Sequence, residues 1–93
     1  MGVCEGIETA IAIHELYGVI VWPCLSAQLL QDREPPDFVH TVRIYADNDW
    51  NYTGQKAAYT LANKLSLKPY ELKVVVYVAK NNDFLDDLNM GIK

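Results

Sequence analysis

The chain has 93 residues, a net charge of −4 at pH 7 and a hydrophobic fraction of 51%. This length allows at most one domain, and the hydrophobic fraction favours a folded domain over a disordered chain. Proteins that hold nucleic acid through its phosphates usually carry an excess of basic residues, so the acidic balance argues against a simple basic binding domain. Two explanations are open: the acidic residues are concentrated at a metal site, or the basic surface lies on domains outside this chain.

The cysteine pattern and the apolar segments indicate a cytoplasmic protein. Cys4 and Cys24 are far apart and form no C-x-x-C pair, which argues against a structural zinc site. A disulfide between them stays open, but both lie in apolar, strand-like runs that favour buried free thiols in a reducing compartment. The sequence lacks both the roughly 18 apolar residues of a membrane span and the pattern of a signal peptide.

The N-terminal part of the chain predicts a short strand and a helix. The apolar residues 1–4 are too few for a full strand and lead into a turn, where Gly6 is expected to permit a tight change of direction. Apolar residues three and four positions apart indicate an amphipathic helix over residues 7–17. Gly18 is expected to close this helix.

A second strand and a short helix are expected next. Residues 19–25 form an apolar run that predicts a buried strand, with Trp22 in the core. Ser26 is expected to cap a short helical turn that extends to Leu30. The polar segment 31–37 contains two consecutive prolines and predicts a loop.

The second half of the chain predicts another strand and a longer helix. Residues 39–46 indicate a strand with Tyr45 in the core, and this strand ends at the acidic triplet 47–49. A helix is expected to begin at Thr53 or Gly54, and its alanines suggest close packing on a sheet. Pro69 is expected to end this region.

The last predicted strand completes an α/β pattern. Residues 72–78 are almost continuously apolar and β-branched, which is typical of a strand that is buried on both faces of a parallel sheet. The acidic tail 82–93 contains a short amphipathic turn. Because strands and helices alternate, we expect an α/β fold with a parallel sheet of about four strands and helices on its faces. The whole chain, 1–93, is expected to form this one domain.

Carboxylates follow three of the predicted strands at the edge where ligands bind in open parallel sheets. Glu5 follows the first strand, Asp47 and Asp49 follow the third, and Asp83 follows the fourth. Like charges that gather in this way need a compensating cation or hydrogen bonds. Mg²⁺ (or Mn²⁺) is the natural candidate, since Mg²⁺ favours a few carboxylates together with waters and phosphates.

Each acidic motif has a simpler interpretation when it is considered alone. The triplet Asp47-Asn48-Asp49 could be a solvated turn with Asx-type hydrogen bonds. Glu5 could simply cap the following helix, where a negative charge is favourable. The combination of the motifs, in their order along the chain, is more informative than either motif.

Four stretches of the chain carry a family resemblance. They are CEGIETA at 4–10, VWPCLSA at 21–27, IYADND at 44–49 with GQKAA at 54–58, and DFLDDL at 83–88. In this order they resemble the motifs of the Toprim family, especially its phage and plasmid DNA primase-like branch, over nearly the whole chain. The resemblance implies a Toprim-like (Rossmann-like) three-layer fold around a parallel sheet. It also implies nucleic acid and nucleotides as partners.

The resemblance implies roles for individual acidic residues. Glu5 would be the acid/base residue of nucleotidyl transfer or strand cleavage, and Asp47 and Asp49 would hold magnesium. Asp83 and Asp86 would help to position metal or phosphate. The chain departs from bacterial replicative primases in one respect: the fourth position after the glutamate, which is acidic there, is a threonine here.

Three further residues lie near the predicted site. Lys56 could contact phosphate from the start of its helix, although a solvated lysine is the simpler interpretation. Trp50 and Tyr52 flank the acidic triplet and could stack on the bases of a single strand. Local packing of these two aromatic side chains is the preferred interpretation.

Several functions are compatible with these residues. The first is magnesium-dependent nucleotidyl transfer of the DNA primase type. The alternatives are a Toprim-type nuclease or topoisomerase-like module, and a non-catalytic domain associated with nucleic acid. A phosphotransfer domain is disfavoured, because its early strand-end aspartate is replaced by Glu5. Since the chain starts almost at the first motif, we expect it to be a fragment of a longer protein and to be inactive by itself.

Overall fold

The computed structural model describes residues 1–36, 38–68 and 71–91. Within these residues, strands and helices alternate along the chain. In order, they are β1 (Gly2–Cys4), α1 (Ile7–Tyr17), β2 (Val21–Pro23), α2 (Ala27–Gln31), β3 (Thr41–Ala46), α3 (Thr53–Ser66), β4 (Lys73–Val78) and α4 (Phe84–Asn89). Asp37, Pro69 and residues 92–93, on which parts of the sequence interpretation fall, lie outside the described residues.

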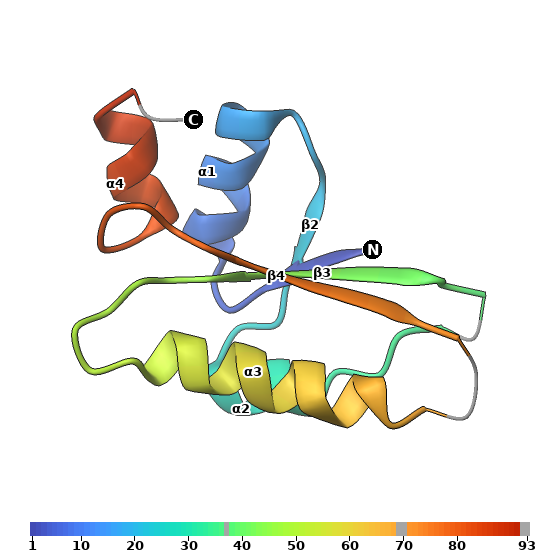
Figure 1. Cartoon of the computed structure of the whole chain (residues 1–93). Coiled ribbons are helices and arrows are strands. Elements are labelled where there is room, and N and C mark those ends of the chain that lie inside the picture. Colours follow the sequence, from blue (N-terminus) through green and yellow to red (C-terminus); the bar gives the residue numbers. More distant parts are fainter. Residues whose placement is uncertain (37, 69–70, 92–93) are drawn as a thin grey trace.

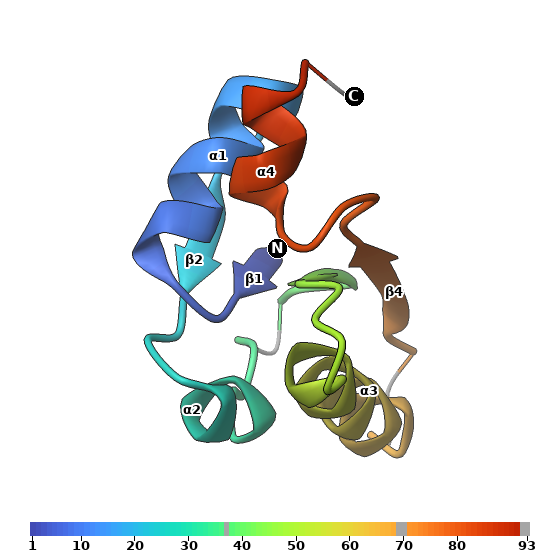
Figure 2. The same cartoon turned by 90° about the vertical axis from the view of Figure 1, so that its left-hand side faces the viewer.

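The strands form a parallel sheet with the order β2-β1-β3-β4. Helices α1 and α4 pack together on one face of this sheet, and α2 and α3 pack together on the other (Figures 1 and 2). The predicted Toprim-like, three-layer α/β fold is therefore confirmed. Because all the strands are parallel, their carboxyl ends lie at the same edge of the sheet.

Alternating side chains along the strands divide the core into two layers. Val3 of β1 and Ile44 of β3 face α2 and α3, whereas Cys4 and Tyr45 face α1 and α4. The first layer also contains the buried face of α3: Ala57, Ala58, Leu61 and Leu65. The small side chains of the two alanines allow close packing on the sheet. Tyr45 is 8% exposed, which confirms its predicted place in the core.

The local signals for helix ends are confirmed. Helix α1 spans the predicted residues 7–17, and Gly18 follows it with a φ of 70°, the left-handed conformation that glycine adopts readily. The backbone N–H of Leu29 donates to the hydroxyl of Ser26 at 3.1 Å, so Ser26 caps α2 as expected. Helix α3 begins at Thr53. Among the residues that the structure describes, no helix is long and apolar enough to span a membrane.

The prediction of a buried strand over 19–25 is wrong in its extent and in its burial. Strand β2 contains only residues 21–23, and Trp22 is 59% exposed. The reason is its position, since β2 lies at one edge of the sheet. Val21 is buried in the layer between the sheet and α1, whereas the indole of Trp22 stays largely in solvent.

Strand β4 was predicted to be buried on both faces, and this prediction is also wrong. It lies at the other edge of the sheet, next to β3. Val74 and Val76 pack against the layer beneath α3. On the opposite face, Tyr77 is 42% exposed, because α1 and α4 do not cover this part of the sheet.

Candidate metal centre

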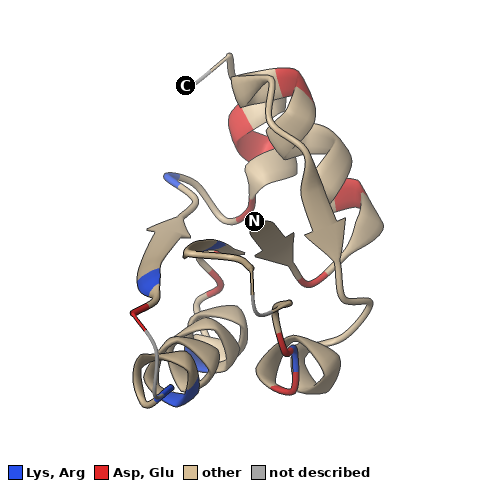
Figure 3. Cartoon of the chain, turned by 90° about the vertical axis from the view of Figure 1, so that its right-hand side faces the viewer, with Lys and Arg blue, Asp and Glu red and all other residues tan. Residues whose placement is uncertain are grey.

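Several acidic residues follow the ends of β1, β3 and β4, although acidic positions also occur elsewhere on the domain (Figure 3, acidic residues in red). Glu5 directly follows β1 and Asp47 directly follows β3, while Asp83 precedes α4 after the loop that leaves β4. Backbone hydrogen bonds hold these loops together. The N–H of Asn48 donates to the carbonyl of Asn82 at 2.8 Å, which joins the loops after β3 and β4.

Asp47 lies at the centre of this group. Its Oδ1 atom is buried and has no hydrogen-bond partner among the described residues. The pKa of Asp47 is raised to about 6, first by burial and then by the negative charges of Asp49, Asp83, Glu5 and Asp86. The structure therefore brings together the five carboxylates that the sequence singled out. They form the acidic group, which consists of Glu5, Asp47, Asp49, Asp83 and Asp86.

The backbone of Asp47 lies against the start of α3. A Cβ atom at Gly54 would lie 3.4 Å from both the N and the O atom of Asp47, and 3.6 Å from its Cβ. The absence of a side chain at Gly54, which is buried, lets the helix approach the acidic loop closely. The glycine that follows the Asp-x-Asp motif thus contributes to the position of Asp47.

Asn48, between the two aspartates, has a structural part. Besides its backbone bond to Asn82, its Oδ1 atom accepts a hydrogen bond from the side-chain amide of Gln55 at 2.7 Å. These two interactions connect the acidic loop to α3 and to the loop after β4. Asn48, the middle residue of the triplet, therefore forms hydrogen bonds within the protein.

Asp83 and Asp86 lie at the start of α4. Oδ1 of Asp83 accepts a hydrogen bond from the backbone N–H of Asp86 at 2.7 Å, so Asp83 is the N-cap of this helix. This contact holds the Asp83 carboxylate next to the acidic group. Asp83 thus has a capping role that the sequence interpretation did not assign to it.

A fully buried carboxylate, Asp87, was missed from the sequence. It accepts hydrogen bonds from the backbone N–H groups of Lys80 at 2.9 Å and Asn81 at 2.8 Å, and from the side-chain amide of Asn81 at 2.8 Å. Burial by itself would raise the pKa of Asp87, but these hydrogen bonds together hold it below its ordinary value. Asp87 fastens the loop after β4 to α4.

A signal for Asp87 was present in the sequence. Phe84, Asp87 and Leu88 are spaced three and four residues apart, which places the aspartate on the apolar face of a helix. Phe84 is 2% exposed, in agreement with this pattern. A charged residue in such a position is buried, and it therefore requires hydrogen-bond partners.

The residues that flank the acidic group are exposed. Trp50 is 86% exposed and Tyr52 is 62% exposed, so the predicted local packing of these side chains is wrong. Tyr52 has a φ of 60°, in the left-handed region that non-glycine residues rarely adopt. Lys56 lies exposed in the first turn of α3.

Two other sequence expectations concern Gly6 and the cysteines. Gly6 has a φ of −117°, an extended conformation open to any residue, so the expected need for glycine at this turn is wrong. Cys4 and Cys24 are free thiols, as expected. Burial, followed by the nearby Cys24 and Asp47, raises the pKa of Cys4 to about 12, which favours the protonated thiol.

The donor set fits a hard divalent cation. Among the described residues, no three His, Cys, Asp or Glu side chains form a ready-made cage around a metal position. Mg²⁺ needs no such cage, because it binds through one or two carboxylates together with waters and phosphates. The unsatisfied Oδ1 of Asp47, surrounded by like charges, is an oxygen that such an ion would satisfy.

Comparison with known families identifies the family of this domain. The family model described as Toprim domain matches residues 1–92, so the chain belongs to the Toprim family. The match confirms the predicted family and does not distinguish its primase-like branch. Toprim domains act on nucleic acids and generally bind divalent metal ions, commonly Mg²⁺. No curated protein and no solved structure matches the chain.

Proposed function

We propose that this domain is the magnesium-dependent catalytic part of a DNA primase-type nucleotidyltransferase. One observation carries the proposal: the buried Oδ1 of Asp47 has no hydrogen-bond partner among the described residues and lies among four other carboxylates. An unpaired buried carboxylate is costly unless a cation compensates it. Its place at the carboxyl edge of the sheet of a Toprim domain supports nucleotidyl transfer at this edge.

The proposed metal ligands are Asp47, Asp49 and Asp83. Asp47 and Asp49 are two residues apart, with Asn48 between them held by contacts to Gln55 and Asn82. When Mg²⁺ (or Mn²⁺) is bound, it polarises a phosphoryl oxygen and compensates negative charge on the reacting phosphate. The protein holds these carboxylates in place through the N-cap hydrogen bond of Asp83 and through the close approach of Gly54 to Asp47.

Glu5 is the proposed acid/base residue. It follows β1, which is the neighbour of β3 in the sheet, and its charge contributes to the raised pKa of Asp47. In nucleotidyl transfer, its carboxylate would accept the proton of the attacking hydroxyl group. Lys56, exposed in the first turn of α3, and Asp86 would help to position the substrate phosphates.

We further propose that the chain is part of a longer protein and that the 93 residues do not synthesise primers alone. Primer synthesis requires a region that positions a template at the reacting nucleotides, and the family match supports only the metal-binding Toprim part of such an enzyme in this chain. The acidic group itself, with five carboxylates, repels a template strand in the absence of metal. The proposal therefore separates metal binding, which this domain should show, from primer synthesis.

A magnesium titration followed by heteronuclear NMR tests the metal site. We expect saturable shifts that cluster at the amides of Glu5, Asp47 and Asp49, and we expect Asp47→Asn to abolish them. Glu15→Gln is the matched control, because it removes an exposed acid of α1 without touching the acidic group. Shifts spread evenly over the surface, or unchanged in Asp47→Asn, would contradict the metal site.

A templated ribonucleotide incorporation assay tests the type of reaction. With the 93-residue domain we expect no incorporation, and in the longer protein we expect incorporation that Glu5→Gln reduces by about 100-fold or more. Incorporation by the domain alone would overturn the fragment proposal. Metal-dependent degradation of the strand, without any synthesis, would instead assign the same residues to a nuclease.

A further inference from the structure

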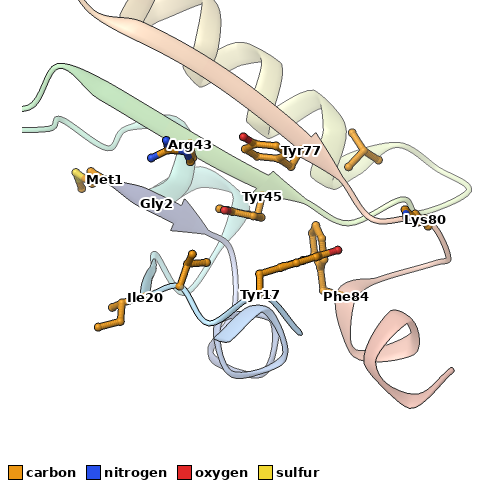
Figure 4. A pocket seen from close by; sticks show the side chains of 11 residues that line it. Met1, Gly2, Tyr17, Ile20, Arg43, Tyr45, Tyr77, Lys80 and Phe84 are labelled. Carbon is orange, nitrogen blue, oxygen red and sulfur yellow. The ribbon is translucent and has the colours of Figure 1, made fainter. Parts of the chain in front are cut away.

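A groove of about 660 Å³ lies on the face of the sheet that carries α1 and α4 (Figure 4). Its floor is formed by β1, β3 and β4, and its walls include Tyr17 of α1 and Phe84 of α4. This volume is within the roughly 300–1,000 Å³ that small-ligand pockets occupy. One end of the groove, at Phe84, lies next to Asp83 of the acidic group.

Aromatic rings form much of the groove. Tyr45 stacks on Tyr77, with ring centroids 5.1 Å apart and an interplanar angle of 20°. Phe84 and Tyr45 form an edge-to-face pair, with a centroid distance of 5.8 Å and an interplanar angle of 70°. Tyr45 is 8% exposed, but Tyr77 and Tyr17 are 42% and 41% exposed. The rings of Tyr77 and Tyr17 are therefore accessible to a ligand in the groove. The ring of Tyr77 is held by its stacking on the buried Tyr45.

The charged side chains that line the groove are both basic. They are Arg43 and Lys80, and no Asp or Glu is among the described lining residues. This is unusual for a chain in which 12 acidic residues outnumber 8 lysines and arginines. Arg43 is exposed and forms no ion pair with another described residue.

The register of the strands places the side chains of Arg43, Tyr45 and Tyr77 on the same face of the sheet. Arg43 and Tyr45 are two residues apart on β3, so their side chains point to the same side of the sheet. Tyr45 is paired with Tyr77 on the neighbouring strand. Lys80 follows β4 at the opposite end of the groove from Arg43 (Figure 4). Positive charge thus stands at both ends of an aromatic surface.

We propose that this groove binds a nucleotide of a single-stranded nucleic acid, with the base stacked on Tyr77 and a neighbouring phosphate at Arg43. Aromatic surfaces combined with a positively charged groove are the means by which proteins hold single strands without sequence preference. The positive lining is complementary to phosphate, whereas the acidic group accepts phosphate only through a metal ion. The inference rests on the proposed function in one respect, namely that a nucleic-acid strand reaches this domain.

Binding of a fluorescently labelled hexathymidylate by the 93-residue domain, measured by anisotropy in EDTA, tests the groove. EDTA removes divalent metal, so binding at the acidic group through a cation does not contribute. We expect Tyr77→Leu to weaken binding by about fivefold or more, since it keeps an apolar side chain but removes the ring. Tyr77→Phe retains the ring and should retain the affinity. Arg43→Gln should weaken binding and reduce its dependence on salt.

Matched controls distinguish the groove from other surfaces. Tyr59→Leu and Lys64→Gln change an exposed tyrosine and a lysine on α3, on the opposite face of the sheet, and should leave the affinity unchanged. Circular dichroism melts identify any variant that fails to fold. If Tyr77→Leu does not fold, the proposal is tested by the affinity of Arg43→Gln and by the NMR shifts that hexathymidylate causes in the wild-type domain.

Several outcomes would overturn the proposal. They are the absence of saturable binding, equal affinity in Tyr77→Leu and Tyr77→Phe, and NMR shifts that lie outside the groove. A loss of affinity in Trp50→Ala but not in Tyr77→Leu would place the base on the loop before α3 instead. Failure here leaves the magnesium shifts at Asp47 untouched, so the two proposals fail separately.

Discussion

Two aspartates near the same edge of the sheet have opposite surroundings. Asp87, which is fully buried, accepts three hydrogen bonds within 2.9 Å from Lys80 and Asn81. The buried Oδ1 of Asp47 accepts none from the described residues, and other carboxylates surround it. The comparison shows that burial of a carboxylate does not by itself identify a functional site. The presence or absence of donors decides whether the charge serves the fold or requires a ligand.

The pKa values of the two groups shift in opposite directions, although burial acts on both in the same way. Burial acts to raise the pKa of both carboxyl groups. In Asp87 the hydrogen bonds to the ionised form outweigh burial and lower the pKa. In Asp47 nearby negative charges add to burial and raise the pKa to about 6. The first group stabilises the folded domain when it is ionised, and the second destabilises it.

The largest effect on the free energy of unfolding is expected from substitution of Asp87, whose carboxylate accepts three hydrogen bonds. Asp87→Ala leaves the partly buried donors of Lys80 and Asn81 without this acceptor and should lower the free energy of unfolding by about 3 kcal/mol. Urea unfolding at pH 7 measures this change. Asn89→Ala, at an exposed position of the same helix, is the control. A loss below about 1 kcal/mol would mean that the hydrogen bonds contribute little.

The contribution of Asp87 should also depend on pH. Because its folded-state pKa lies below the unfolded value of 3.8, the stabilisation is fully present above that pH. It is lost as the pH falls through the lower, folded-state pKa. Asp87→Asn should therefore flatten the acid side of the stability curve. An unchanged acid side in this variant would contradict the role assigned to the ionised carboxylate.

Asp47→Asn should raise the stability of the domain, in contrast to substitution of Asp87. Its folded-state pKa is raised to about 6, so ionisation opposes folding as the pH rises from about 4 to about 6. In EDTA at pH 7 the neutral variant should be more stable by about 1–3 kcal/mol. Magnesium should then stabilise the wild-type domain and leave the variant unchanged. Equal stabilisation of both proteins by magnesium, in thermal melts, would remove Asp47 from the metal site.

Asp83 combines a structural and a proposed functional part, and two substitutions separate them. Asp83→Ala removes the N-cap of α4 and should cost about 1 kcal/mol. Asp83→Ser keeps a capping oxygen without the charge, so it should cost only a few tenths of a kcal/mol. If Asp83 is a ligand, both variants should weaken magnesium binding to the same extent. Magnesium affinity that is unchanged in Asp83→Ser would limit this residue to capping.

The smallest effect on stability is expected at Gly54. A Cβ atom there makes contacts of 3.4 Å with the Asp47 backbone, and alanine is the better helix former, so Gly54→Ala should change stability by less than about 1 kcal/mol. Gly54→Val carries two further methyl groups towards the same loop. It should weaken magnesium binding more than Gly54→Ala does. Equal magnesium affinities, measured by calorimetry, would show that the close approach does not position Asp47.

Predictions from the sequence succeeded where the signal is local. The spacing of apolar residues and the glycine at position 18 predicted the bounds of α1, and Ser26 predicted the start of α2. Predictions of burial were less successful, at Trp22 in β2 and along β4. An apolar run does not show whether its strand lies at the centre or at the edge of a sheet. That position depends on the other strands and on the helices that cover them.

The sequence by itself determined the order of the elements, and with it the parallel sheet and the gathering of Glu5, Asp47 and Asp83 at one edge. These features follow from periodicity and strand direction, which are properties of the chain. Only the tertiary structure decided that Asp87 is satisfied and Asp47 is not, because the donors come from the path of the loops in space. It also decided which side chains stay uncovered, and so created a basic, aromatic groove on an acidic protein.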